Sequence, residues 1–157
     1  MLRKVILFFT LVLVALTTGR AFWTWVAENP ANLSGATYVE FFQALERAIT
    51  IPIAVTAIGG CVLVGISALL FRSDRTVFYL LLATCGFCLV ANLVTIFVNK
   101  PINAQILTWN PAALPKDYRE LLSRWWQWHY VRLVTLLAAM TLLFVATLIR
   151  REPRPGL

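Results

Sequence analysis

The stretch from Ala48 to Phe71, AITIPIAVTAIGGCVLVGISALLF, holds 24 residues and no charged side chain. A second uncharged run of 24 residues follows from Thr76 to Asn99. A helix that crosses the ~30 Å hydrocarbon core of a bilayer needs about 20 apolar residues. Both runs are continuously apolar rather than alternating, which favours helices over the strands of a barrel. The two stretches therefore predict two membrane-spanning helices joined by a short turn.

Two further apolar segments lie on either side of this pair. Leu133 to Ile149 is uncharged, and so is Val5 to Gly19, with apolar residues continuing past Arg20. The chain is 60% hydrophobic and only 13% charged, whereas soluble domains carry about 25% charged residues. We therefore predict an all-α integral membrane four-helix bundle. Its spans are expected at about 5–26, 48–71, 76–99 and 130–149, within a single transmembrane domain that takes in residues 1–157.

The first of these segments also has the basic start and apolar run of a secretory signal peptide. Thr17-Thr18-Gly19-Arg20 is a poor cleavage site, however, and apolar residues continue beyond it. We interpret the segment as an uncleaved first helix.

The distribution of charge predicts the orientation of this bundle. In a four-span topology one side holds seven basic residues in short flanks: Arg3, Lys4, Arg72, Arg75, Arg150, Arg151 and Arg154. Five of the seven acidic residues fall in the two longer loops on the other side. Positive charge favours the cytoplasmic side, so both termini are expected in the cytoplasm, as in a bacterial inner membrane protein. The basic residues form no stripe on a polar domain, which argues against a nucleic-acid partner and leaves the lipid bilayer.

Two of the helices are expected to extend beyond the membrane on the outer side. Thr37-x-x-Glu40 has the form of a capping box that would open the second helix. Pro115 suits the start of the last helix. Both helices would then be longer than the hydrocarbon core requires. Pro52 is expected to kink the second helix near the interface.

The two outer loops share a short pattern. Asn29-Pro30-Ala31-x-Leu33 recurs as Asn110-Pro111-Ala112-x-Leu114, and Tyr38-x-Glu40 recurs as Tyr118-x-Glu120. A duplicated helical hairpin would place the pattern twice between an outgoing and a returning helix. Coincidence in loop-rich sequence is the alternative.

Polar side chains are spaced so that they converge near the outer end of the predicted bundle. On the last helix Trp125, His129 and Arg132 share one face. Ionisable groups at membrane depth are costly and mark functional sites by default. The other helices add Gln43 and Glu46, and Asn92, Asn99 and Asn103 along one stripe. We predict a polar pocket under an aromatic rim that includes Trp109 and Trp125.

Each of these residues also has a purely structural interpretation. His129 could be a hydrogen-bonded bystander, and Arg132 could pair with Glu46 and only orient the helices. The tryptophans could form an interfacial belt. Metal binding is not expected, because one histidine and Glu46 supply two ligands where zinc or iron needs three or four.

The motif Asn99-x-Pro101-x-Asn103, followed by Arg124-Trp125-x3-His129-x2-Arg132, resembles the anthrone oxygenase-like family of small four-helix membrane proteins. The resemblance extends from the second to the last helix. It implies a membrane oxidoreductase, of monooxygenase type, that acts on a lipid-soluble aromatic or quinol-type compound.

The residues can be matched to that chemistry. An anthrone is a weak carbon acid whose enolate reacts with O2, so no cofactor is required. His129 would serve as the base. Arg132 or Arg124 would stabilise the oxyanion, with Asn99 and Asn103 as further donors. Trp125, Trp109, Glu46 and Gln43 would line the substrate slot.

Two other functions fit the same sequence. The chain could be a non-catalytic subunit or scaffold of a larger membrane complex, in which His129 and Arg132 lock the bundle. It could also be a small-molecule carrier that acts as a homo-oligomer, with Asn92 at midspan. Loss of turnover, loss of a partner, or transport that depends on Asn92 would separate the three.

Overall fold

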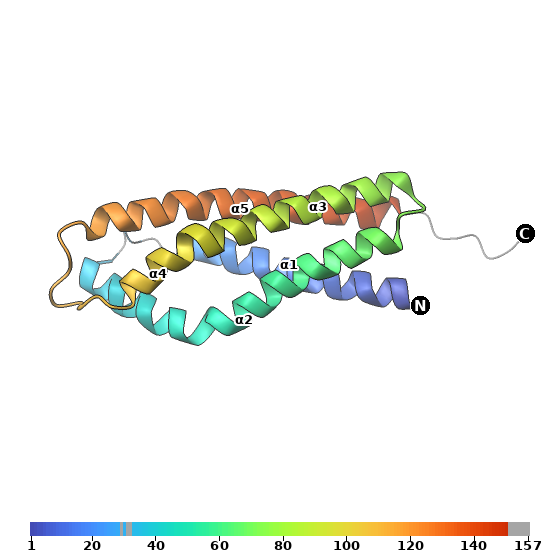
Figure 1. The fold of residues 1–157 in the computed structure, drawn as a ribbon. Helices are drawn as coiled ribbons and strands as arrows, with labels where there is room; N and C mark the ends of the chain where they lie inside the picture. Colours follow the sequence, from blue (N-terminus) through green and yellow to red (C-terminus); the bar gives the residue numbers. More distant parts are fainter. Residues whose placement is uncertain (29, 31–32, 151–157) are drawn as a thin grey trace, which may run out of the picture.

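The computed structural model describes residues 1–28, 30 and 33–150 and forms an antiparallel bundle of four long helices (Figure 1). The first two are α1 (Leu2–Ala27) and α2 (Gly35–Leu70). The third is a continuous helix made of α3 (Arg75–Val94), the π-helical turn η2 (Thr95–Asn99) and α4 (Lys100–Ile106). The fourth is α5 (Tyr118–Ile149). All four are long and apolar enough to cross a membrane, which confirms the predicted four-helix membrane bundle.

The two ends of the bundle differ in their charge. The end where α1 begins and α5 stops is here called the terminal end, and the other is called the 107–117 end after the segment that joins α4 to α5. At the terminal end the guanidinium groups of Arg3 and Arg150 lie 6.0 and 5.6 Å from the centre of the Phe71 ring. Arg151 and Arg154 of the predicted basic flank lie outside the described residues.

The third helix is longer than predicted. The predicted span ends at Asn99, where the uncharged run stops, but the helix continues to Ile106. Proline removes a backbone donor and crowds the preceding turn. The wider i→i+5 turn of η2 comes directly before it and accommodates this mismatch. The α3–η2–α4 helix, with 32 residues, is therefore as long as α5 and, like α2 and α5, much longer than the ~20 residues that a bilayer core requires.

The start of α2 also differs from the prediction. Thr37 was expected to cap the helix with Glu40, but both lie inside α2. Ser34 is the capping residue, and its Oγ accepts a hydrogen bond from the Thr37 backbone N–H at 3.2 Å. Serine at this position satisfies one of the unpaired donors of the first turn.

The predicted hairpin duplication stays a prediction. Asn29 and Ala31 of its first copy lie outside the described residues. In the second copy, Asn110 Oδ1 accepts a hydrogen bond from the Ala112 backbone N–H at 3.0 Å and so closes a local turn.

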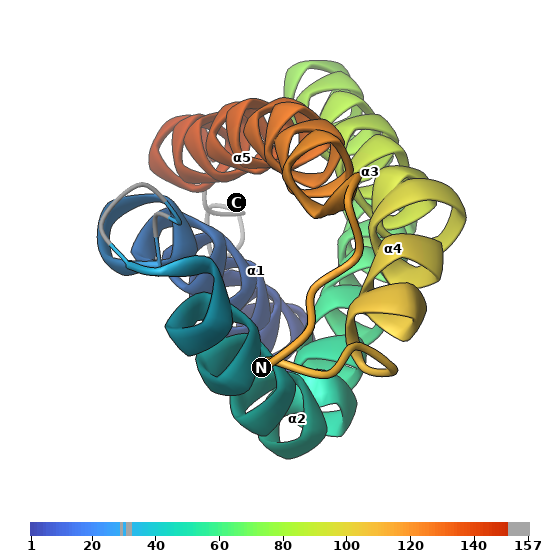
Figure 2. The ribbon, with the colours of Figure 1, turned by 90° about the vertical axis from the view of Figure 1, so that its left-hand side faces the viewer.

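Packing is close in the terminal half and looser towards the 107–117 end. A cluster of buried aliphatic and small side chains, including Val64, Leu81 and Leu143, fills the terminal half. Gly60 of α2 packs against Leu13 of α1, where an added Cβ would lie 3.4 Å from the Leu13 Cβ. Pro52 lies inside α2, and α2 as a whole is bent (Figure 1). Seen from the 107–117 end, the helices surround a central space (Figure 2).

Candidate functional site

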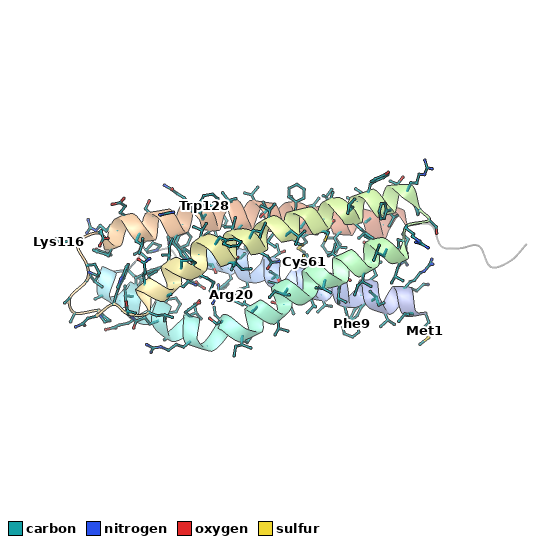
Figure 3. All side chains as sticks on the ribbon, in the orientation of Figure 1. Met1, Phe9, Arg20, Cys61, Lys116 and Trp128 are labelled. Carbon is teal, nitrogen blue, oxygen red and sulfur yellow. The ribbon has the colours of Figure 1, made fainter. Side chains whose placement is uncertain are left out.

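A cavity of about 160 Å³ occupies this space and is lined by residues from all the long helices. Its inner part, toward the middle of the bundle, is apolar and includes Val14, Cys61, Cys88 and Leu136. Figure 3 places Arg20 and Cys61 between the two ends of the bundle. The cavity also has a charged part, which comprises Arg20, Glu28, Glu46, Lys100 and Arg132. The lining of the cavity therefore changes from apolar to charged along its length.

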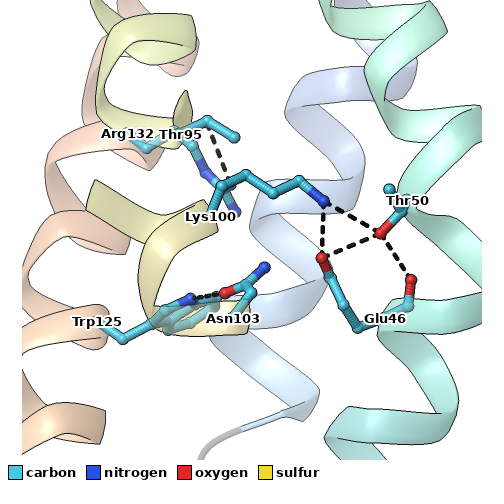
Figure 4. A network of polar contacts seen from close by, with 7 residues as sticks. All are labelled: Glu46, Thr50, Thr95, Lys100, Asn103, Trp125 and Arg132. Atoms are coloured by element: carbon cyan, nitrogen blue, oxygen red, sulfur yellow. Dashed lines mark hydrogen bonds and ion pairs between the residues drawn. The ribbon is translucent and has the colours of Figure 1, made fainter. Parts of the chain in front are cut away.

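Both carboxylates of the cavity are paired with cations. Arg20 of α1 and Glu28, the residue that follows α1, form an ion pair with an N–O distance of 2.6 Å. Glu46 of α2 and Lys100 of α4 form a second pair at 2.8 Å, which spans the gap between these helices (Figure 4). Thr50 joins that pair, because its hydroxyl lies 3.0 Å from Glu46 Oε1 and accepts from Lys100 Nζ at 3.1 Å.

Arg132 is the cation in this cavity without a carboxylate partner among the described residues. Its Nη2 donates to His129 Nδ1 at 2.9 Å, and its Nη1 donates to Thr95 Oγ1 at 3.4 Å. The Nε–H is buried and finds no acceptor in the described part of the chain. The alternative in which Arg132 pairs with Glu46 is wrong, because Glu46 is bound by Lys100 instead. The cavity wall therefore carries a positive charge that no carboxylate of the described residues contacts.

His129 lies behind Arg132 and is 0% exposed. Its Nδ1 faces Arg132, and its Nε2 lies 3.1 Å from the Ala21 carbonyl oxygen of α1. Arginine can only donate and a carbonyl can only accept. The ring is therefore neutral, with its hydrogen on Nε2 and its one lone pair occupied. In this arrangement the imidazole positions Arg132 and joins α5 to α1. The role of His129 as a base stays a prediction.

Trp125 supplies a flat apolar wall to the cavity. Its ring stacks on that of His129, with centroids 5.1 Å apart and 5° between the planes. Its Nε1 donates to Asn103 Oδ1 at 2.6 Å. Trp125 and Asn103 both line the cavity, as the sequence interpretation expects. The amide of Asn103 is thus engaged in holding the indole.

Asn99 does not join Asn92 and Asn103 at the cavity. It is buried against α5 and donates its Nδ2 to the Trp125 backbone oxygen at 3.2 Å. Asn99 is the last residue of the π-helical turn, and within that turn it faces α5. Lys100 comes to face the cavity in its place.

The remaining predicted site residues lie outside the cavity wall. Gln43 donates from Nε2 to the backbone oxygens of Ile106 and Trp109, each at 2.9 Å, and so ties α2 to the end of α4. Trp109 itself packs against a neighbouring hydrophobic cluster. Arg124 is exposed on the outer face of α5.

The expected aromatic rim is also only partly present. Two other tryptophans near the 107–117 end, Trp23 and Trp128, are 61% and 37% exposed. Figure 3 shows Trp128 on the outside of α5. This position suits an interfacial belt.

Lys100 is the residue that sequence reasoning missed. A lysine at the end of an apolar run is typical of a residue at the membrane interface that flanks a span. The need of Glu46 for a cation was the available signal, but the register change in η2 could not be read from the sequence. Within the described residues no three His, Cys, Asp or Glu side chains gather as a metal-ligand set.

A comparison with known families identifies the chain. The anthrone oxygenase family model matches residues 41–142, from the first turns of α2 to the second half of α5. The match includes Glu46, Lys100 and Arg132 but not Arg20 or Glu28 of α1. No curated protein and no solved structure matches the chain. With more than half of its length covered by the family model, the chain belongs to the anthrone oxygenase family.

Proposed function

We propose that this protein is a membrane oxidoreductase that uses O2 to oxidise a lipid-soluble aromatic compound with an acidic C–H bond, such as an anthrone. The family assignment supports the reaction class. The cavity supports the substrate class, because it combines an aromatic wall, an apolar inner part and a charged part. Such pockets, apolar with a few placed polar groups, are typical of small-molecule sites.

The unpaired charge of Arg132 is the observation on which the proposal rests. Removal of a proton from the C–H bond of an anthrone gives an enolate whose negative charge lies on the oxygen. A preorganised donor in a water-poor site stabilises such an oxygen strongly. Arg132 lines the cavity, and His129 and Thr95 hold it through one N–H of each Nη group. Each Nη group carries a second N–H, and we assign these to the oxyanion.

We assign proton uptake to Glu46. It is a carboxylate on the cavity wall, its side chain is 13% exposed, and it belongs to α2 rather than α5, which carries Arg132. The contacts of Lys100 and Thr50 are with Oε1, so Oε2 is the oxygen assigned to the substrate proton. Positioned carboxylates are common general bases. The lone pair of His129 is already used by Arg132, which makes the histidine the weaker candidate.

The reaction balances without any added group. The enolate gives electrons to O2, and a C–O bond forms at the carbon that lost the proton, as a hydroperoxide. Loss of water from that hydroperoxide gives the second carbonyl. One anthrone and one O2 thus yield one anthraquinone and one water. The protein holds the ring, takes up the proton and stabilises the oxyanion.

The test is turnover of anthrone under O2 by the purified full chain in lipid vesicles, measured as anthraquinone formed above the spontaneous rate. Arg132→Gln is expected to lower kcat by about 10²–10³-fold, the usual effect of losing one oxyanion donor. Arg47→Gln is the matched control, because Arg47 is an exposed cation on α2 next to Glu46. It should leave turnover unchanged. Background rates with a folded wild-type protein would contradict the proposal and favour the scaffold interpretation.

We also infer the orientation in the membrane from charge. The basic flanks gather at the terminal end, and this end is expected to face the cytoplasm of a bacterial inner membrane. Labelling of single surface cysteines from either side of intact cells would check this orientation. Assembly as a homo-oligomer, or within a larger membrane complex, stays a prediction.

A further inference from the structure

The side of the cavity between α2 and the α3–η2–α4 helix is crossed by two polar bridges. Nearer the 107–117 end, Lys100 Nζ reaches Glu46 at 2.8 Å and Thr50 at 3.1 Å. Deeper in the bundle, Asn92 Nδ2 donates to the Ala57 backbone oxygen at 3.4 Å. From Asn92 to Lys100 the helix rises by roughly 12 Å. The two bridges therefore frame an interval, here called the window.

No polar bridge between the two helices is found inside the window among the described residues. Apolar side chains line most of its walls: Ile53 and Ala54 on α2, and Ile96 on η2. The two threonines of the interval, Thr56 and Thr95, donate to backbone oxygens of their own helices. Ile96 is nevertheless 51% exposed on the outside of the bundle. A side chain that both lines a cavity and faces outward stands at an opening. The window therefore connects the cavity with the lipid-facing surface.

Two irregular turns hold the helices apart at this level. Pro52 removes a backbone hydrogen bond from α2 at the height of the window. The π-helical turn Thr95–Asn99 forms the opposite wall. Helices bend at prolines and at such turns, and π-turns are frequent at functional sites. Both irregularities thus coincide with the opening rather than with the closely packed terminal half.

The volume of the cavity is small compared with that of a three-ring ligand. Its volume of about 160 Å³ is close to that of an engineered cavity of ~150 Å³ that takes up one benzene ring. A fused three-ring compound needs more room than that. Part of such a ligand must therefore extend from the cavity into the window, between Ala54 and Ile96.

We propose that the ligand enters this cavity sideways from the bilayer, through the window between α2 and η2, and that Ala54 and Ile96 set the width of the passage. The identity of the ligand rests on the proposed function. The route follows from the opposed apolar walls and from the exposure of Ile96. It assigns the protein a substrate that is dissolved in the half of the membrane nearer the 107–117 end.

The test measures the binding of anthraquinone, a stable probe, by quenching of tryptophan fluorescence after vesicles that carry it are mixed with vesicles that carry the protein. Ala54→Phe should slow association by about tenfold, which is ~1.4 kcal/mol on that barrier, and should also weaken binding, because the bound ligand extends between Ala54 and Ile96. Ile96→Ala should speed both association and release. Val55→Phe is the matched control, since Val55 is the next residue of α2, is 62% exposed and does not line the cavity. It should leave both rates as in the wild type.

The outcomes separate the route from the reaction. Unchanged rates in both Ala54→Phe and Ile96→Ala would overturn the window, even if anthrone is turned over normally. A fall in affinity at an unchanged association rate would also overturn it, because Ala54 would then only shape the binding wall. Window variants that alter the rates as expected, in a protein that turns over no anthrone, would support the window and contradict the proposed reaction. Ile96→Ala keeps the test decisive if Ala54→Phe fails to fold.

Discussion

In the terminal half of the bundle, small and aliphatic side chains close the space between the helices, whereas in the other half the same helices leave a cavity. The closed half contains Val64, Leu81 and Leu143, each 0% exposed. The open half contains Pro52, the π-helical turn and the ion pairs of the cavity. Helices in lipid associate through close packing rather than through the hydrophobic effect. The comparison suggests that the terminal half supplies stability, and that this allows the other half to keep an open site.

The same substitution in the two halves gives the sharpest contrast. Leu143→Ala should destabilise the protein by about 2–5 kcal/mol, because it leaves a void in a closed core. Leu45→Ala enlarges a cavity that already exists, so it should cost about 1 kcal/mol or less. Thermal unfolding in mild detergent would measure both. Equal losses of stability would show that the division into a closed and an open half has no energetic meaning.

His129 contributes both to stability and to the site, because it is buried and also holds Arg132. His129→Ala leaves the Ala21 carbonyl and Arg132 without this partner, and should cost about 1–3 kcal/mol of stability. Turnover should fall through misplacement of Arg132, by less than in Arg132→Gln. The shape of the pH profile of kcat/KM should stay the same, since His129 is not assigned as the base.

The pH profile decides between the two roles of His129. If kcat/KM of the wild type rises with pH over a range in which kcat/KM of His129→Ala does not, the histidine is the base after all. His129→Gln, which keeps a hydrogen-bonding side chain, is the matched variant and should recover part of the lost stability.

Lys100 gives the smallest expected effect. Its side chain is 40% exposed, so the pair with Glu46 is partly screened, and Lys100→Gln should change stability by about 1 kcal/mol or less. The bridge at the edge of the window would be weakened, so anthraquinone should associate and dissociate faster. Slower exchange in this variant would mean that the pair does not restrict the window. Lys116→Gln, at the far tip of the bundle (Figure 3), is the control.

The sequence by itself determined the fold class, with its four long apolar helices, and the family. Long uncharged runs such as Ala48–Phe71 leave no alternative to helices in lipid, because the backbone must satisfy its own hydrogen bonds there. The spacing of Trp125, His129 and Arg132 also placed them correctly on one helix face, since only the local 3.6-residue period is needed. The convergence of Glu46, Asn103, Trp125 and Arg132 on one cavity followed from the same patterns.

Only the tertiary structure determined which side chains of the site contact one another. Whether Glu46 pairs with Arg132 or with Lys100 depends on how the helices are rotated about their own axes. The π-helical turn directly before Lys100 changes that rotation in the third helix. Whether His129 faces a ligand or stands behind Arg132 depends on the approach of α1, whose Ala21 carbonyl occupies the second ring nitrogen. Local periodicity fixes which residues share a face, but the partners across a bundle are set by contacts between segments far apart in the chain.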